Sequence, residues 1–168
     1  METRHILFRE AEMNDIPDII QIYELAKNFM RIRGNQAQWN NGYPGETDIV
    51  SDIKRKNLFV GIDHDNDIVC VFAFIIGEDP TYASIDGNWI NEEPYGTIHR
   101  IATNGKHSRL FDECTDFCLK KINNLRIDTH VDNLPMLNAL ARNNFVKCGV
   151  IICADGTPRE AYQFCKQQ

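Results

Sequence analysis

The sequence predicts an α/β (α+β) protein with a mixed, mostly antiparallel sheet of about seven strands and about four helices on both faces. Three observations predict this class. Apolar residues recur with a strand period in some segments and a helix period in others. The run DIVCVFAFII (67–76) is apolar on both faces, which is typical of a central, covered strand. The strand–helix–strand unit around 108–122 demands a parallel pair, because its connection contains a whole helix.

The N-terminal elements follow from local patterns. HILFREA (5–11) reads as a strand, and Asn14 and Asp15 form a capping pair before a helix that tolerates Pro17 in its first turn. The helix is predicted at about 15–31, where these apolar residues recur at helical spacing: Ile16, Ile19, Ile20, Tyr23, Ala26 and Met30.

A loop with the sequence RGNQAQWNNGYPGE (33–46) follows this helix. It contains Trp39 and Tyr43 but has no element of its own to bury their rings. Two interpretations are open: both rings fold back on the core, or the loop covers a bound substrate and both residues contact it.

The remaining elements alternate between strands and helices. Thr47 and Asp48 can cap a second helix, and HDND (64–67) is a hairpin signal because Asp and Asn accept turn dihedrals. The predicted order is a helix at 48–56, strands at 57–63, 67–76 and 95–103, a helix at 108–122, a strand at 124–130, a helix at 133–143, and strands at 145–152 and 159–165.

Length and composition indicate a single domain spanning 1–168. A chain of 168 residues can bury roughly two thirds of its unfolded surface in one core. The apolar fraction of 43% and the charged fraction of 25% are those of an ordinary soluble protein, and no repeat or low-complexity tract interrupts them.

The charge balance argues against a nucleic-acid partner. The formal net charge is −6, whereas affinity for a phosphate backbone comes mostly from clustered Lys and Arg. METRHILFRE (1–10) lacks the apolar core of a signal peptide, and no stretch approaches the roughly 20 apolar residues that span a membrane. We therefore expect a cytoplasmic protein without a membrane partner.

The cysteines predict neither a disulfide framework nor a metal site. None of the six forms a C-x-x-C pair, and four lie inside apolar patterns, where a reduced thiol behaves as a small hydrophobe. We expect free thiols and no bound metal.

A turn before the third predicted helix has the outline of a phosphate site. Asn104, Gly105 and Lys106 form a tight turn, and the first amides of the helix lack internal partners. His107 and Arg109 add positive charge. An ordinary turn is the alternative, but the turn follows the end of a parallel strand, where an open sheet leaves a crevice.

Four segments together resemble the GNAT superfamily of acyl-CoA-dependent N-acetyltransferases, and they span nearly the whole chain. FREAEMNDIPDIIQIYELA resembles the opening strand and helix of the family, and LFVGIDHDNDIVCVFAF its central hairpin. HRIATNGKHSRL resembles the pyrophosphate-binding motif, and NLPMLNALARNNF the Asn-headed helix that flanks coenzyme A. The resemblance implies a GNAT-like sheet whose central parallel pair splays apart.

The resemblance also implies a binding site for acetyl-CoA as co-substrate. Asn133 would border the pantetheine arm from one side. The backbone that would pair with the arm from the other side belongs to Ile101, Ala102 and Thr103. The amides that would hold the pyrophosphate belong to Gly105, Lys106, His107, Ser108, Arg109 and Leu110.

Several positions depart from the family pattern. Only Gly105 remains of the small residues in the pyrophosphate motif, with the bulkier His107 and Arg109 near the later positions. Leu140 stands where the family commonly has the Tyr that protonates the departing thiolate. Asn144 replaces a helix-terminal Gly and tolerates the same left-handed cap.

The implied reaction is direct acetyl transfer to a primary amine of a small molecule or amino-acid-like substrate, which needs a proton acceptor. His130, at the end of a strand, is the preferred base because imidazole titrates near neutrality, and a helix cap is its alternative role. Asp128 has a structural alternative as an acceptor for backbone N–H groups. The other candidates are His99, Glu92 and Glu93 as bases, Tyr95 and Tyr162 as proton donors, and Trp89 as a wall of the amine pocket or part of the core.

Other functions remain open beside this one. A non-catalytic acyl-CoA-binding regulatory module would explain the shortened pyrophosphate loop and Leu140. A protein-acetylating enzyme is a third option, which the negative net charge favours only weakly. Members of the superfamily often dimerise, so a homodimer is one expected assembly.

Overall fold

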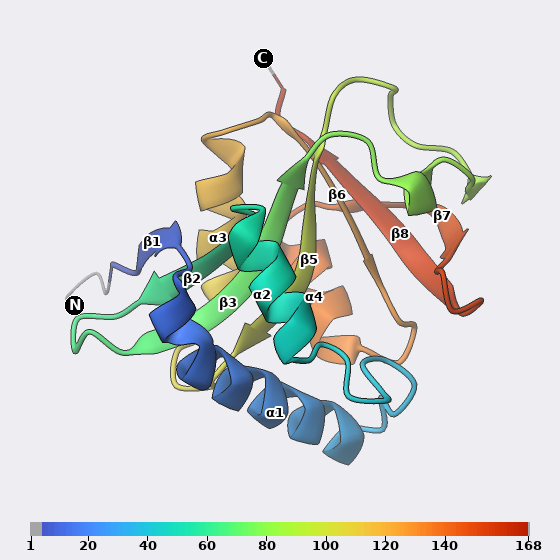
Figure 1. Ribbon diagram of the computed structural model, residues 1–168. Coiled ribbons are helices and arrows are strands. Elements are labelled where there is room, and N and C mark those ends of the chain that lie inside the picture. The colour runs from blue at the N-terminus through green and yellow to red at the C-terminus, as the bar shows by residue number, and fades with distance from the viewer. Residues whose placement is uncertain (1–4, 168) are drawn as a thin grey trace. The chain divides into compact units, whose positions relative to one another are not determined.

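The computed structural model describes residues 5–167 and contains four α-helices, two short 3-10 helices and eight strands (Figure 1). Met1–Arg4, at the start of the segment METRHILFRE, lie outside the described residues. The helices are η1 (Met13–Asp15), α1 (Ile16–Ile32), α2 (Glu46–Lys54), η2 (Pro80–Tyr82), α3 (Leu110–Leu119) and α4 (Leu134–Arg142). The strands are β1 (Leu7–Glu10), β2 (Leu58–Ile62), β3 (Ile68–Ile76), β4 (Asp86–Gly87), β5 (Gly96–Thr103), β6 (Asn124–Thr129), β7 (Val146–Ile152) and β8 (Pro158–Cys165).

The strands form a mostly antiparallel sheet that includes one parallel pair. Their order is β1-β2-β3-β5-β6-β8-β7-β4, and β5 with β6 is the parallel pair. The predicted fold class is therefore confirmed. The strand that the sequence analysis did not predict is β4, which has only two residues and pairs with β7.

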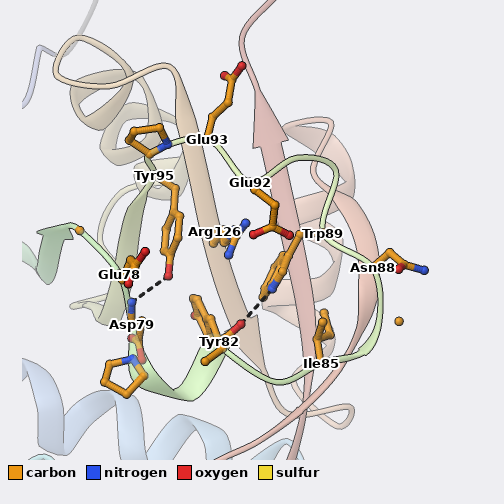
Figure 2. A pocket seen from close by; sticks show the side chains of 15 residues that line it. Glu78, Asp79, Tyr82, Ile85, Asn88, Trp89, Glu92, Glu93, Tyr95 and Arg126 are labelled. Carbon is orange, nitrogen blue, oxygen red and sulfur yellow. Dashed lines mark hydrogen bonds between the residues drawn. The ribbon is translucent and has the colours of Figure 1, made fainter.

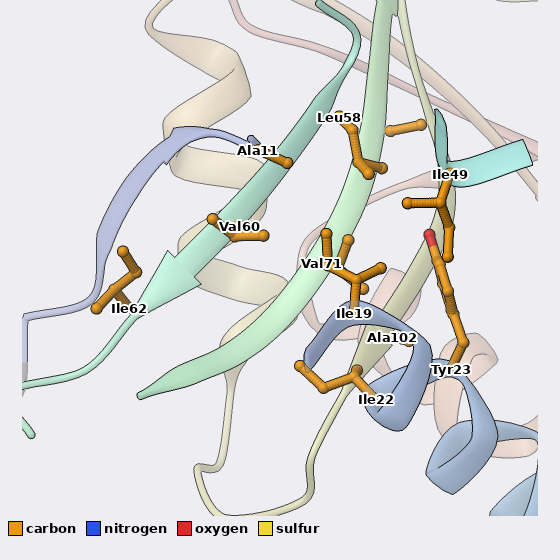
Figure 3. Packing of buried hydrophobic residues seen from close by; sticks show 11 residues of the cluster. Ala11, Ile19, Ile22, Tyr23, Ile49, Leu58, Val60, Ile62, Val71 and Ala102 are labelled. Atoms are coloured by element: carbon orange, nitrogen blue, oxygen red, sulfur yellow. The ribbon is translucent and has the colours of Figure 1, made fainter. Parts of the chain in front are cut away.

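The chain divides into two compact units, of which the first runs up to Phe74 and resumes at Arg100–Glu113. Its core joins α1 to the β2–β3 hairpin (Figure 3). Ile19 and Tyr23 of α1 are almost completely buried, and they belong to the same apolar cluster as Val60 and Val71 of the hairpin. The helical spacing of the apolar stripe predicted this packing.

The second unit comprises Ile75–His99 and Cys114–Gln168. Its antiparallel ladder runs β6–β8–β7–β4. A smaller apolar cluster contains Tyr82, Tyr95 and Ile151, and Trp89 packs against it. Three of these four residues come from the connection between β3 and β5, so this long segment is anchored on the unit.

The parallel pair is joined only at its start. β5 and β6 pair at Gly96 with Leu125 and at Thr97 with Arg126. Within residues 5–167, no β5–β6 pairing continues beyond Thr97 and Arg126, although both strands run on, β5 as far as Thr103. The parallel pair is therefore splayed: it is hydrogen-bonded at its start and separates afterwards.

Several boundaries differ from the predicted ones because the caps differ. α2 begins at Glu46 rather than 48, since Gly45 is its N-cap residue and the Asp48 carboxylate accepts a hydrogen bond from the Gly45 amide (2.8 Å). α3 begins at Leu110 rather than 108, because Arg109 has a left-handed backbone (φ 62°) that no helix continues. Asn133 caps α4 as predicted, accepting a hydrogen bond from the Met136 amide (3.4 Å).

Sequence-based expectations concerned three further features: the cysteine thiols, the helices as possible membrane spans, and the domain organisation. All six cysteines are free, as predicted. None of the helices in residues 5–167 combines the length and apolar composition that crossing a membrane requires. The single-domain organisation remains a prediction.

Candidate functional site

A cavity of about 600 Å³ lies in the second unit, against the connection between β3 and β5 (Figure 2). Carboxylate and aromatic side chains dominate its wall, and Arg126 of β6 is the only cation among the lining residues. The charged and aromatic side chains of the lining include Glu78, Asp79, Tyr82, Trp89, Glu92, Tyr95 and Arg126.

Asp79, which lines the cavity, forms a hydrogen-bonded pair with His99 of β5. His99 Nε2 lies 2.7 Å from Asp79 Oδ2. Burial alone would raise the pKa of Asp79, but its hydrogen bond and charge interaction with His99 and its bond with Thr81 hold that pKa below its ordinary value. The carboxylate is therefore ionised and can only accept, so Nε2 of His99 carries the proton. In a neutral imidazole, Nδ1 is then the unprotonated nitrogen.

Two tyrosines adjoin this pair. The Tyr95 hydroxyl accepts a hydrogen bond from the Asp79 amide (2.7 Å), so its own proton is left for another acceptor. The Tyr82 hydroxyl donates to Asp128 Oδ2 (2.6 Å), and the Tyr82 ring lies 6.1 Å from that of His99. Burial first, and then the Asp128 carboxylate, raise the pKa of Tyr82 well above its ordinary value. Tyr82 is therefore a neutral donor that fixes Asp128.

Arg126 is 3% exposed, and its guanidinium lies between two aromatic rings. The guanidinium carbon is 4.1 Å from the ring centre of Trp89 and 4.0 Å from that of Tyr95. One terminal nitrogen donates to the Asn91 carbonyl (2.8 Å). The Trp89 indole in turn donates to the Tyr82 carbonyl (3.1 Å), which holds the ring in place.

His130 lies at the end of β6 and is engaged in the turn before α4. Its Nδ1 accepts a hydrogen bond from the Asp132 amide (3.1 Å). A backbone N–H can only donate, so Nδ1 is unprotonated and the proton of a neutral ring is on Nε2. This is the capping interaction that was the alternative interpretation of His130. Asp128, His99 and Tyr95 are thus brought into one cluster, whereas His130 is held in the neighbouring turn.

The residues expected to bind the coenzyme belong to the first unit, except Asn133, which belongs to the second. Ile101, Ala102 and Thr103 end β5, and the Asn104 amide then donates to the Val69 carbonyl (3.0 Å). Gly105 has φ 76°, and a Cβ built there would meet no atom within 4 Å. The turn is therefore open around the position that a Cβ of residue 105 would occupy.

Two of the amides expected to hold pyrophosphate are engaged locally. The Gly105 amide donates to Thr103 Oγ1 (3.4 Å), and the Lys106 amide donates to Asn104 Oδ1 (3.0 Å). His107 Nε2 lies 3.1 Å from Asp63 Oδ2, so this ring is already engaged with a carboxylate. The amides of His107, Ser108, Arg109 and Leu110 are the remaining candidates for holding the pyrophosphate.

The aromatic residues of the loop 33–46 behave differently from each other. Trp39 packs on the apolar core beside Tyr23, with 5.5 Å between ring centres. Tyr43 is 40% exposed, and its hydroxyl accepts a hydrogen bond from Arg100 (3.1 Å). Arg100 also forms a two-pronged ion pair with Asp52, at 3.0 Å for both nitrogens. The core interpretation therefore applies to Trp39, and a substrate role remains open for Tyr43.

Of the remaining candidates, Glu92 and Glu93 line the cavity, and Tyr162 is engaged in a local contact. Glu92 and Glu93 are exposed, and Figure 2 shows the Glu93 side chain directed away from the other labelled side chains. The Tyr162 hydroxyl donates to Glu160 (2.9 Å); burial and this carboxylate raise the pKa of Tyr162 to about 12. Asp63, His64 and Asp65 of the hairpin turn lie close enough together to surround a cation, and Asp63 also accepts hydrogen bonds from the Asp65 and Asp67 amides. The absence of a bound metal remains a prediction.

Solved structures share this architecture over nearly the full chain. An acetyltransferase of the GNAT family from Streptococcus agalactiae 2603 is 31% identical to this chain. The alignment covers 97% of this chain and 96% of the other, with a TM-score of 0.85. This chain belongs to the GNAT family of acetyltransferases.

More distant GNAT structures confirm the fold alone. A GNAT-family acetyltransferase from Listeria monocytogenes 4b F2365 is 16% identical, covers 94% of this chain and 93% of its own, and has a TM-score of 0.69. The ribosomal-protein-S18-alanine N-acetyltransferase from Escherichia coli is 12% identical, covers 98% and 96%, and has a TM-score of 0.61. No protein-family model and no curated protein matches the sequence.

Sequence reasoning missed several polar groups at the cavity of this GNAT protein. Leu140, at the usual Tyr position of the family, is completely buried and supplies no proton. Asp79, Tyr82 and Arg126 were not predicted as site residues. Arg126 left a detectable signal, since it interrupts an apolar strand pattern, where a charge is rarely buried without a reason.

Proposed function

We propose that this GNAT protein transfers an acetyl group directly from acetyl-CoA to a primary amine of a small or amino-acid-like molecule. The observation that carries the proposal is the hydrogen-bonded pair of His99 and Asp79 beside a cavity, in a chain of a family of acetyltransferases. Such a pair is the usual means of accepting a proton near neutral pH.

In the proposed reaction, His99 is the base. The amine loses a proton to Nδ1 of His99, and its lone pair attacks the thioester carbonyl carbon. The C–N bond forms, the C–S bond breaks, and coenzyme A leaves as a thiolate that takes a proton from Tyr95. The second proton of the attacking nitrogen restores the Tyr95 hydroxyl, so the amide product is neutral. Asp79 holds the imidazole in the tautomer that leaves Nδ1 unprotonated and stabilises the imidazolium that forms.

Tyr95 is the proposed source of the proton for the thiolate. Its hydroxyl accepts from the Asp79 amide and therefore has its own proton to give. Tyr95 would thus replace the family acid whose position Leu140 occupies. His130 is the weaker candidate for a base, because taking a proton at Nδ1 would break its hydrogen bond with Asp132.

For the coenzyme we propose the segment Ile101–Leu110 together with Asn133. A solved GNAT-fold structure, the NatC complex, is bound to a Gag peptide and CoA; it is 11% identical to this chain and has a TM-score of 0.62. The open turn at Gly105 and the cation of Lys106 suit a diphosphate. A small-molecule amine is the proposed second partner, and a homodimer remains a prediction.

Turnover of amines is the direct test. Purified protein mixed with acetyl-CoA and a panel of primary amines is expected to release free thiol and to form an N-acetyl product, detected by mass spectrometry. Acetyl-CoA binding by calorimetry without acetylation of any amine would instead support a non-catalytic acyl-CoA-binding module, the function that the buried Leu140 favours.

Reversing the charge of Lys106 is expected to weaken acetyl-CoA binding about tenfold, since an added carboxylate near a diphosphate costs on the order of 1–2 kcal/mol. Lys106→Glu can be compared with Lys120→Glu, which makes the same charge change just after the opposite end of α3. Calorimetric titration should show weaker binding for the first variant alone. Equal affinities of the two variants would place the diphosphate elsewhere.

A further inference from the structure

The cavity of the second unit joins one buried cation to an exposed acidic rim. Arg126 is 3% exposed, whereas Glu78 and Glu92 are exposed to solvent. In Figure 2, the Arg126 guanidinium lies between the rings of Tyr95 and Trp89, among the side chains that line the cavity. A ligand entering this cavity therefore meets negative charge at the rim and positive charge inside.

Within the described residues, aromatic rings and a carbonyl surround the buried cation, and no counter-charge pairs with it. No carboxylate in residues 5–167 lies within ion-pair distance of Arg126, and its fully buried Nε has no hydrogen-bond acceptor. Two aromatic faces and the Asn91 carbonyl are the contacts that compensate it. Burying a charge without a paired anion is costly, so such an arrangement indicates a site completed by a ligand.

The two rings also determine how the cation can be used. They cover both faces of the planar guanidinium, so only its edge is left for hydrogen bonding. An arginine edge held in one orientation matches the two oxygens of a carboxylate, which it binds through parallel hydrogen bonds. A flat, delocalised cation between two rings thus favours a planar carboxylate as its partner.

We propose that Arg126 binds the carboxylate of the acceptor, and that the acceptor is a small amino acid carrying an amine and a carboxylate on one molecule. The inference rests on the proposed acetyl transfer and names its substrate class. Glu78 and Glu92 at the rim favour the ammonium end of such a molecule. Asp79 and His99 are then the groups that deprotonate it.

Matched pairs of acceptors test this directly. For each amino acid, the corresponding decarboxylated amine carries the same side chain and an amine but no carboxylate. Wild-type protein is expected to prefer the amino acid by about 10²-fold in kcat/KM, because the amine leaves a buried cation unpaired. Equal kcat/KM values for acid and amine would overturn the inference and leave the proposed function standing.

Substitutions of Arg126 test whether this residue causes the preference for amino acids over the decarboxylated amines. Arg126→Met is expected to reduce the preference to less than about threefold, and Arg126→Lys to give an intermediate value, since a point charge lacks the two-pronged geometry. Arg159→Met is the matched control. Arg159 is also a buried arginine of this unit, but it lies outside the cavity lining and donates to Thr157 and Pro158. A preference retained in Arg126→Met would contradict the assignment.

A binding measurement separates the two proposals and covers the case in which a variant fails to fold. The side-chain Nε–H signal of Arg126 in wild-type protein can be followed by NMR during titration with amino acids and with the decarboxylated amines. A shift with amino acids alone supports the carboxylate site, even if no amine is acetylated and the proposed function fails. An unchanged signal with all amino acids would overturn the inference whatever the turnover.

Discussion

Replacing His99 with glutamine is expected to lower kcat by about 10²–10⁴-fold, the range that a positioned general base contributes. The glutamine amide can still donate to Asp79, which keeps the local hydrogen bond of the wild type (2.7 Å) but provides no nitrogen that accepts a proton. The affinity for acetyl-CoA should change little. Steady-state kinetics with a saturating amine, together with calorimetric titration of acetyl-CoA, measures both quantities.

His130→Gln is the matched control for this experiment, because it removes the imidazole that was the first choice from the sequence. The ring of His130 accepts from the Asp132 amide and is expected to affect the turn before α4 rather than the chemistry. Its kcat should stay within about threefold of the wild-type value, as expected for a residue outside proton transfer. The reverse result, a large loss with His130→Gln and none with His99→Gln, would exchange the two roles.

Replacing Asp79 with asparagine is expected to lower kcat by about 10²–10⁴-fold, because an amide in place of the carboxylate can hold the imidazole in the wrong tautomer. An amide nitrogen facing Nε2 donates instead of accepting, so the imidazole proton moves to Nδ1, the nitrogen that must be vacant. The double variant with His99→Gln should be no slower than the slower single variant, since the two residues act as one unit. If the fold-losses in kcat of the two single variants multiply in the double variant, Asp79 and His99 act independently.

Asp79→Asn should also change how the free energy of unfolding depends on pH, which an activity assay does not measure. The pKa of Asp79 in the folded protein is lower than its ordinary value, so the carboxylate stabilises the fold above the pKa it has when unfolded. This contribution is lost as the pH falls through the lowered folded-state pKa. Denaturant unfolding should therefore find Asp79→Asn less stable than wild type at neutral pH, with the difference shrinking in acid. A difference independent of pH would mean that packing, not charge, stabilises the site.

Most of the fold could be predicted because its determinants are local. The alternation of helix and strand periods placed every strand longer than two residues, and the HDND segment formed its hairpin, with Asn66 in the left-handed conformation (φ 65°). β4 was missed because Asp86 and Gly87 have no apolar pattern, and pairing with β7 alone makes them a strand. The start of α2 was misplaced because Gly45, which has no side chain to offer as a cap, is its N-cap residue.

The candidate site was predictable only in part, for a different reason. His99, Tyr95 and Asp128 stood out as polar residues of the two strands in the predicted parallel pair, and the structure groups them in one cluster. Their partners Asp79 and Tyr82 lie in a long connection, where an aspartate before a proline reads as an ordinary turn. Nothing in the sequence reveals that an imidazole 20 positions away will bond to that aspartate.

The aromatic clamp on Arg126 also has an optical consequence. The Trp89 indole is in van der Waals contact with a full positive charge, and its N–H is anchored on the Tyr82 carbonyl. Neutralising that charge changes the electric field across the ring and hence the energy of its excited state. The second tryptophan, Trp39, belongs to the core of the other unit, so a Trp39→Phe background would leave Trp89 as a built-in fluorophore that senses the occupancy of the cavity.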